Sequence, residues 1–209
     1  MGGGLWLAAV RRPAGTVKPL DAASTLPIEG GASFSLGNRL FRVFWSCAWL
    51  LLCRWTPPPL HGWRCRVLRA FGARIAPGAR VHASVRIWHP RHLTMGSHAL
   101  IGPGAIVYNQ GAITIGARSV ISQRAHLCAS SHDIRDPNFQ LVLRPVEIGE
   151  RCWVAAEAFV GPGVRMGDGA VLAARGALFS HAEPGTVYRG NPAMKVGPRR
   201  LGEGRNAPD

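Results

Sequence analysis

Residues 75–92 read IAPGAR VHASVR IWHPRH, and residues 95–112 read MGSHAL IGPGAI VYNQGA. Each block of six begins with an aliphatic residue or Met and carries a small residue or Val in fifth place, with Arg91 as the exception. The same pattern fills residues 115–132, 148–165 and 166–183. The apolar first positions are Ile75, Val81, Ile87, Met95, Ile101, Val107, Ile115, Ile121, Leu127, Ile148, Val154, Val160, Met166, Leu172 and Leu178.

A strict period of six fits neither an α-helix, which needs apolar residues every three to four positions, nor an ordinary strand, which needs them every two. It fits a short strand followed by a corner. Three such sides close a triangular coil of about eighteen residues, with the apolar residue inside and the small residue packed under the turn. The sequence therefore predicts an all-β solenoid, a parallel β-helix of about five coils.

A longer spacing supports this division into coils. Met95 and Ile115 begin successive coils and lie twenty residues apart, which is one coil of eighteen plus the inserted pair Ile113-Thr114. Residues 133–145 break the pattern, so we expect them to loop out of the solenoid between the third and fourth coils.

Length and hydrophobic content suffice for one well-buried domain. The free ends of a solenoid usually carry atypical caps, so we expect residues 34–72 to form a helical cap and residues 73–189 to form the β-helix domain. Residues 1–33 are rich in Gly, Ala and Pro and are predicted to be disordered, and residues 190–209 are predicted to be a C-terminal tail. Arginines follow the apolar start of the chain, and no small-residue cleavage pattern comes after it, which disfavours a secretory signal.

Residues 36–55 are predicted to form a helix that stops before Pro57. The uncharged run within it, residues 43–53, is too short to span a bilayer. Two roles remain open and are compatible: a cap on the first coil, and a membrane-surface helix whose arginines (Arg39, Arg42 and Arg54) lie near lipid phosphates. A second short helix is expected at about residues 62–71.

The formal net charge of +14 favours a polyanionic partner such as nucleic acid, an anionic membrane or a phosphorylated small molecule. The sequence has no aromatic-and-basic single-strand-binding pattern and no recognition helix, so nucleic acid is not an expected partner. The five cysteines are odd in number and include no Cys-x-x-Cys pair, which favours neither a disulfide framework nor a thiolate zinc site. We expect a chain in the reducing cytoplasm that needs no metal.

Chemistry has to come from outward-facing residues, because the interior of such a coil is narrow and apolar. His132 takes the sixth position of its block, outside the core, at the last corner before the loop. The other seven histidines are interpreted as solvent-exposed side chains. His132 is therefore the first candidate for a catalytic role.

The residues around His132 resemble those of a known family. Its ordered motifs are SHD at 131–133, VEIGERCWVA at 146–155, VGPGV at 160–164 and GNPA at 190–193. This series resembles the hexapeptide-repeat, left-handed β-helix acyltransferases. The further motifs LHGWR at 60–64, LRAFGA at 68–73, ISQ at 121–123 and WVAAEAF at 153–159 are most similar to the colanic-acid-biosynthesis acetyltransferases. The resemblance runs from about Leu36 to Val196.

The resemblance implies a homotrimer with acetyl-CoA in the groove between neighbouring subunits, so that each active site draws on two chains. It implies that His132 is the general base that takes the proton from an acceptor hydroxyl. It also implies that the backbone N–H of Ala156 donates to the oxyanion. The CoA thiolate is a good leaving group, so a direct transfer without a covalent enzyme intermediate is expected.

Other residues take their expected roles from position in the same family pattern. The backbone of Ala174 would meet the pantetheine arm, and the C-terminal cations would either meet the CoA phosphates or form a solvated basic tail. Trp153 would border the acceptor and His132, or pack as an ordinary aromatic at a subunit interface. The residues assigned to the acceptor are Trp153, Asn109 and Asp133, and those assigned to CoA are Ala174, Lys195 and Arg199, followed by Arg200.

These expectations combine into a CoA-dependent O-acetyltransferase that modifies a sugar hydroxyl in exopolysaccharide or related glycan synthesis. We expect it in the cytoplasm, at or near the inner face of the membrane. Two alternatives stay open at this point: a non-catalytic β-helix scaffold in glycan assembly, and a zinc enzyme of the γ-type carbonic anhydrases. The zinc enzyme would need three histidines converging on one metal, whereas His126 and His132 lie on different sides of the coil. The acceptor and the modified hydroxyl are not fixed by the sequence.

Overall fold

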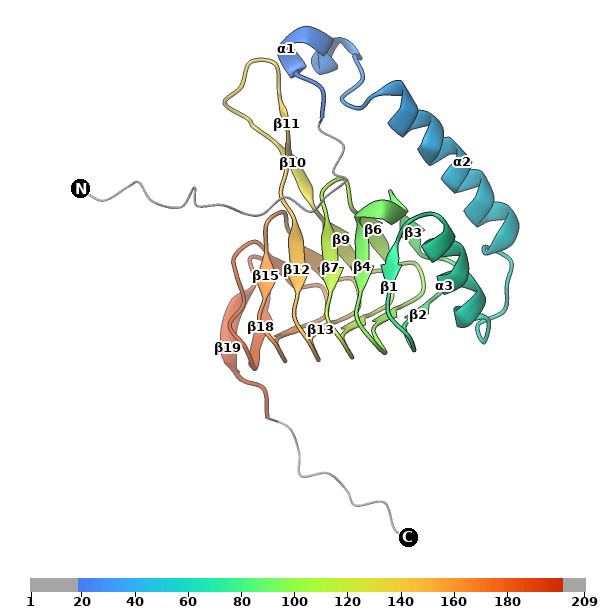
Figure 1. Cartoon of the computed structure of the whole chain (residues 1–209). Coiled ribbons are helices and arrows are strands. Elements are labelled where there is room, and N and C mark those ends of the chain that lie inside the picture. The colour runs from blue at the N-terminus through green and yellow to red at the C-terminus, as the bar shows by residue number, and fades with distance from the viewer. Residues whose placement is uncertain (1–18, 201–209) are drawn as a thin grey trace, which may run out of the picture.

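In the computed structural model of the chain, which describes residues 19–200, three parallel sheets form the faces of a triangular solenoid (Figure 1). The first sheet contains β1 (Arg74–Ile75), β4 (Leu93–Met95), β7 (Ile113–Ile115), β12 (Val146–Ile148) and β15 (Arg165–Met166). The second contains β2 (Arg80–Val81), β5 (Leu100–Ile101), β8 (Val120–Ile121), β13 (Trp153–Val154), β16 (Val171–Leu172) and β18 (Thr186–Arg189), with β19 (Met194–Pro198) antiparallel at its edge. The third contains β3 (Arg86–Ile87), β6 (Ile106–Tyr108), β9 (His126–Cys128), β14 (Phe159–Val160) and β17 (Ala177–Leu178). The predicted parallel β-helix is confirmed.

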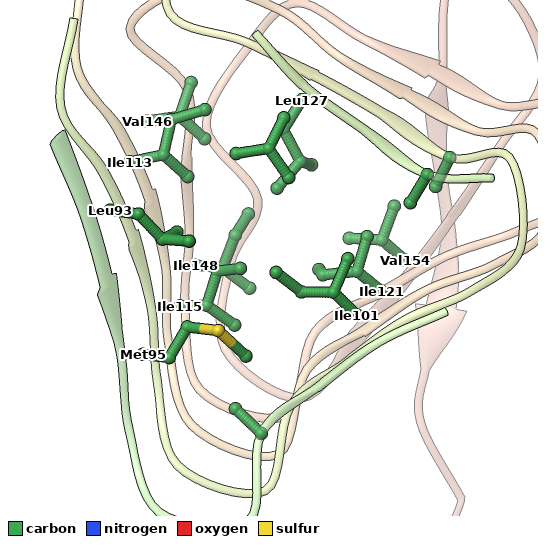
Figure 2. Packing of buried hydrophobic residues seen from close by; sticks show 14 of the residues in the cluster. Leu93, Met95, Ile101, Ile113, Ile115, Ile121, Leu127, Val146, Ile148 and Val154 are labelled. Carbon is green, nitrogen blue, oxygen red and sulfur yellow. The ribbon is translucent and has the colours of Figure 1, made fainter. Parts of the chain in front are cut away.

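The apolar first positions of the six-residue blocks form the core. All fifteen are buried, and most have no exposed surface. Figure 2 shows how they stack along the solenoid, for example Met95 over Ile115 and Ile148. Each rung therefore repeats the packing of its neighbour, which is why a six-residue pattern is enough to specify the fold.

The inserted pairs also contribute to this core. Leu93, Ile113 and Val146 have no exposed surface and stack in register on the first sheet (Figure 2). Each pair lengthens its strand from two residues to three, so that one extra aliphatic side chain points inward and its neighbour points outward. The insertions widen one face of the prism without changing the register of the coils.

Glycine occupies the second position of several six-residue blocks because successive coils lie close together there. A Cβ atom on Gly96 would lie 2.5 Å from the backbone nitrogen of Ala117 in the next coil, and one on Gly116 would lie 2.4 Å from the carbonyl carbon of Gly149. The left-handed backbone occurs instead at the fourth position, which is occupied by glycine or by residues such as Arg118 (φ 57°). Second-position glycines are thus required by close approach of the next coil.

Two helices cover the N-terminal end of the solenoid (Figure 1): α2 (Leu36–Leu52) and α3 (His61–Ala70). The hydroxyl of Ser35 caps α2 by accepting from the N–H of Asn38. The indole N–H of Trp45 donates to the carbonyl of Ile87, and that of Trp49 donates to the carbonyl of Ala83. The predicted cap therefore packs on the first coil. Among residues 19–200, every helix is too short or too polar to span a bilayer.

The third coil ends earlier than predicted. Ala129 is its last buried apolar residue, and Ser131, assigned by the repeat to a packed corner, is exposed. The chain leaves through β10 (Ser130–His132), turns, and returns through β11 (Leu141–Leu143), and the two strands pair antiparallel. Residues 133–145 thus form most of a projecting hairpin (Figure 1).

Both chain ends differ from the expected layout. Residues 19–33 contain α1 (Ala22–Thr25) and the 3-10 turn η1 (Pro27–Glu29) in place of the expected disorder. A second short 3-10 turn, η2 (Pro90–His92), lies in the first coil. β19 continues the second sheet, so residues 190–198 belong to the solenoid rather than to a free tail. The expectations for residues 1–18 and 201–209 lie outside the described residues.

Candidate functional site

His132 is the last residue of β10, where the paired strands of the projecting hairpin meet the connecting loop. Its ring stacks on Phe139, with 4.2 Å between ring centroids and 7° between planes. Its Nδ1 lies 2.8 Å from the carbonyl oxygen of Phe139. A carbonyl only accepts hydrogen bonds, so Nδ1 carries the proton and Nε2 of the neutral ring is left with a free lone pair. The hairpin therefore fixes the tautomer that a general base requires.

His132 lines a cavity of about 340 Å³, which we call the His132 pocket. Arg39 and Arg42 of α2 line it on another side, together with Gln110 from the second coil. Residues 30–34 close it from the N-terminal side. The pocket thus joins four parts of the chain: the hairpin, the helical cap, the segment that precedes the cap and the second coil.

The segment before α2 is fastened to the hairpin through Gln140. Its Oε1 accepts from the N–H of Ala22 at 2.6 Å, and its Nε2 donates to the carbonyl of Leu20 at 3.3 Å. Phe34 packs against Trp88 of the first coil, with 4.9 Å between ring centroids. The N-terminal wall of the His132 pocket is therefore built from specific contacts.

Two residues assigned to the acceptor have structural partners instead. Asn109 has no exposed surface, and its side-chain amide bonds both the N–H and the carbonyl of His89 in the coil below. A side chain without exposed surface cannot contact an acceptor, so Asn109 is better described as a bridge between coils. Asp133 accepts from the backbone N–H of Arg135 and pairs with its guanidinium, and these hydrogen bonds lower the pKa of the carboxyl. Asp133 does not orient the His132 ring, because Phe139 already occupies Nδ1.

Trp153, Ala156 and Ala174 lie on a different part of the solenoid from His132. Trp153 is 46% exposed on the second sheet and donates its indole N–H to the hydroxyl of Ser122. Ala156 and Ala174 occupy equivalent turns in the fourth and fifth coils, at the corner between the second and third sheets. Within residues 19–200 neither alanine N–H has a hydrogen-bond acceptor. Their small side chains and free donors fit an acyl-CoA chain running along this corner.

The C-terminal cations lie near the same end of the solenoid. Lys195 pairs with Glu183 at 2.5 Å, which raises the pKa of the ammonium. Arg199 donates to the carbonyls of Arg151 and Gly169. Arg200 is exposed. Lys195 and Arg199 would have to exchange these partners to bind the phosphates of CoA.

Two histidines interpreted as solvent-exposed are buried instead. His89 and His92 are 2% and 5% exposed and stack on each other with 4.5 Å between ring centroids. Burial lowers the pKa of His89 to about 3, helped by His92 and the charge of Arg91. Within the part of the chain that the structure describes, no three His, Cys, Asp or Glu side chains gather in a group that could hold a metal.

The chain matches no family model. It is 41% identical over 163 residues to WcaF of Escherichia coli (strain K12), provisionally named a colanic acid biosynthesis acetyltransferase, and the match covers 78% of this chain and 90% of WcaF. The chain belongs to the hexapeptide-repeat acetyltransferases. A chloramphenicol acetyltransferase of Klebsiella aerogenes is 41% identical over a shorter stretch of 49 residues, 23% of each protein.

Solved structures of hexapeptide-repeat acetyltransferases share the fold. The acetyltransferase VCA0836 from Vibrio cholerae superposes with a TM-score of 0.72 at 18% identity, covering 80% of this chain and 95% of that one. A galactoside acetyltransferase in complex with coenzyme A superposes with a TM-score of 0.73 at 16% identity, covering 87% and 92%. The predicted left-handed β-helix is confirmed by this similarity. Family membership also displaces the scaffold and carbonic anhydrase alternatives.

Phe139, Arg39 and Gln110 were not among the predicted site residues of this acetyltransferase. Phe139 lies in the hairpin, where the six-residue repeat gives no positions. Arg39 belongs to a helix that the sequence relates only to the cap or to a membrane. Gln110 could have been suspected, because it directly follows Asn109, which the family pattern assigns to the acceptor. Only the folded chain, however, shows that Gln110 lines the same pocket as His132.

Proposed function

We propose that this acetyltransferase transfers the acetyl group of acetyl-CoA to a hydroxyl of a sugar in exopolysaccharide or related glycan synthesis, with His132 as the general base. The observation that carries the proposal is the hydrogen bond from His132 Nδ1 to the carbonyl of Phe139, because it leaves Nε2 free to accept a proton. The name of WcaF supports the glycan context, and a galactoside acetyltransferase shares the fold.

The proton leaves the acceptor hydroxyl for His132 Nε2 as that oxygen attacks the acyl carbonyl. Negative charge then develops on the acyl oxygen and needs a donor. The N–H of Ala156, free of other acceptors among residues 19–200, is available for this role. Loss of such a donor typically costs about 2.7 to 4 kcal/mol of transition-state stabilisation. The thiolate of CoA leaves as the ester forms.

Within one subunit, the proposed base and the proposed oxyanion donor lie at different corners of the solenoid. His132 projects near the corner between the third and first sheets, whereas Ala156 and Ala174 lie at the corner between the second and third. A homotrimer in which the His132 corner of one subunit faces the Ala156 corner of the next would complete three equivalent sites. The exposed side chains of Trp153 and Phe179, at 46% and 60%, support a contact between subunits on these faces.

The catalytic proposal is tested by measuring thiol release from acetyl-CoA with a panel of sugar acceptors. His132→Ala is expected to lower kcat by about 10²- to 10⁴-fold, the usual contribution of a general base, with little change in the affinity for CoA. The matched control is His181→Ala, which removes an exposed histidine of the fifth coil. Equal rates for wild type and His132→Ala would exclude His132 as the base.

The trimer is tested by analytical ultracentrifugation. Trp153→Ala is expected to weaken association and to lower activity at dilute protein concentration. A monomer that retains full activity at all concentrations would contradict the shared site.

The outer face of α2 supports the proposal that the enzyme works at the cytoplasmic face of an anionic membrane. Trp45 and Trp49 point toward the solenoid, while Leu40, Phe44 and Leu51, exposed by 60%, 65% and 68%, lie on the opposite side of the helix. A helix with an exposed apolar face, arginines on another side and no acidic residue is typical of interfacial helices.

The membrane contact is tested by sedimentation with vesicles. Wild type is expected to bind vesicles that contain phosphatidylglycerol and to bind pure phosphatidylcholine weakly, and the double variant Phe44→Glu with Leu51→Glu is expected to remain in the supernatant. If wild type ignores both kinds of vesicle and the double variant changes the oligomeric state, the face is a contact between subunits instead.

A further inference from the structure

The His132 pocket contains two cations and no acidic residue. Arg39 and Arg42 lie on one face of α2, three residues apart, and both line the pocket with His132. Neither arginine forms an ion pair within residues 19–200. Of the residues that the structure does not describe, 1–18 contain neither Asp nor Glu, and 201–209 contain Glu203 and Asp209.

Arg42 is positioned by packing, and part of its hydrogen-bonding capacity is unused. Its guanidinium carbon lies 4.4 Å from the centroid of the Trp88 ring, a cation–π contact. Its Nε is buried without a hydrogen-bond partner. Burial lowers the pKa of this guanidinium, which nevertheless stays charged near neutral pH. A half-buried cation with an unused buried donor is stabilised when an anion binds beside it.

The position of the pocket along the solenoid indicates that it holds the acceptor and not acetyl-CoA. α2 covers the N-terminal coils, whereas Ala156 and Ala174, the residues proposed to follow the acyl-CoA chain, lie in the fourth and fifth coils (Figure 1). The hairpin that carries His132 leaves the solenoid between these two regions, after the third coil. The arginines therefore lie on the side of the base away from the proposed CoA path.

We infer that Arg39 and Arg42 bind an anionic group of the acceptor, so that the enzyme prefers acidic sugars over neutral ones. This inference rests on the proposed function. The guanidinium groups suit both a carboxylate and a phosphate, so the acceptor is an acidic sugar, either a uronic acid or a sugar phosphate. Gln110 lies in the same pocket; its Nε2 donates one hydrogen to the Tyr108 hydroxyl, which leaves its second N–H and its Oε1 for sugar hydroxyls.

The experiment compares three acceptors that differ in charge: methyl glucoside, methyl glucuronide and glucose 1-phosphate. Wild type is expected to show at least about tenfold higher kcat/KM for one or both acidic acceptors than for methyl glucoside. Arg39→Gln and Arg42→Gln are each expected to lower kcat/KM for the acidic acceptor by about 10- to 100-fold, mainly through KM, and to leave the KM for acetyl-CoA unchanged. The preferred acceptor tells whether the bound group is a carboxylate or a phosphate.

Two further variants separate charge recognition from folding. Arg42→Lys keeps a cation in the pocket and is expected to retain part of the preference. Arg66→Gln removes an exposed arginine of α3 that does not line the pocket and is expected to change nothing. Because Arg39 is exposed, its variant is expected to fold even if Arg42→Gln does not.

The outcomes also separate this inference from the proposed function. Acetyl transfer to methyl glucoside at the same efficiency as to the acidic acceptors, in wild type and both Gln variants, would overturn the inference and leave the proposed function intact. A rise in the KM for acetyl-CoA in the Gln variants, without loss of the acidic preference, would assign the arginines to CoA and also overturn it. Absence of transfer to any acceptor would reject both.

Discussion

The two halves of the solenoid share one repeat but differ in their charged surfaces. From Gly30 to His132, which includes both large helices and the first three coils, the chain contains many arginines and no Asp or Glu. From Asp133 onward, carboxylates return and pair with cations: Glu147 with Arg165, for example. The inward positions are alike in both halves, so the core does not dictate this difference.

Even the buried arginine of the N-terminal half does without a carboxylate. Arg64 has no exposed surface, and its guanidinium is held by the carbonyls of Val81, Pro57 and Pro58 and by the hydroxyl of Thr56. Carbonyl oxygens satisfy its donors while leaving the net positive charge in place. Apart from Arg124, which pairs with Glu157, the N-terminal half therefore carries an uncompensated positive field, which suits an acidic acceptor and an anionic membrane.

The largest expected difference between the halves is sensitivity to acid. The folded pKa of His89 is about 3, against about 6.5 for an unfolded chain, so between these values the unfolded chain binds more protons. The free energy of unfolding should therefore be highest above pH 6.5 and should fall as the pH falls, by up to about 1.4 kcal/mol per pH unit for this group. Urea unfolding at pH 7, 6, 5 and 4 measures the slope.

A variant locates this sensitivity in the N-terminal half. His89→Phe keeps a ring that can stack on Phe41, whose centroid lies 4.7 Å away, and removes the titrating nitrogen. The slope below pH 6.5 is expected to flatten by up to about 1.4 kcal/mol per pH unit. The control His181→Phe, at an exposed position of the C-terminal half, should keep the wild-type slope. An unchanged slope in His89→Phe would show that His89 does not limit stability in acid.

The fold could be predicted because its information is local and repeated. Ile101, Ile121 and Val154 take the same place in successive rungs, so one pattern of apolar and small residues specifies every coil. The pattern failed at Ser131, where the sequence continues to match a block of six but the chain leaves to form a hairpin. Pairing with residues 141–143 decided that departure, and a six-residue pattern does not include such partners.

The candidate site was predictable only in part. His132 stands out by its place before the loop, but its orientation depends on Phe139, seven residues away across a turn. Asn109 matches a family position near the acceptor, yet its amide bonds His89 twenty residues earlier. Arg42 reaches the pocket because α2 packs on the first coil through tryptophan hydrogen bonds. These relations depend on contacts between coils, which residue spacing alone does not reveal.

A smaller effect is expected from removing a paired carboxylate in the C-terminal half. Glu157 pairs with both Arg124 and Arg175, and so links the third, fourth and fifth coils. Because both arginines are largely exposed, Glu157→Gln is expected to cost only about 0.5 to 1 kcal/mol. Thermal unfolding in low and high salt tests this, since the difference between wild type and variant should shrink as salt screens the pairs. A loss that does not depend on salt would mean that packing, not charge, explains the effect.

The smallest effect comes from giving the N-terminal half a pair that the C-terminal half already has. On the first sheet Arg74 lies opposite Thr94, and three rungs later Glu147 lies opposite Arg165 at the equivalent positions. Thr94→Glu would place a carboxylate beside the guanidinium of Arg74, whose Nε now lies 3.3 Å from the Thr94 hydroxyl. A cross-strand pair of this kind contributes about 0.2 to 1 kcal/mol, reduced here by the better strand propensity of Thr. Denaturant unfolding should show Thr94→Glu more stable than the isosteric control Thr94→Gln by a few tenths of a kcal/mol, about the lower end of that range. Equal stability of the two variants would mean that the lack of carboxylates in the N-terminal half does not lower its free energy of unfolding. Their absence would then matter only for the charge of the surface.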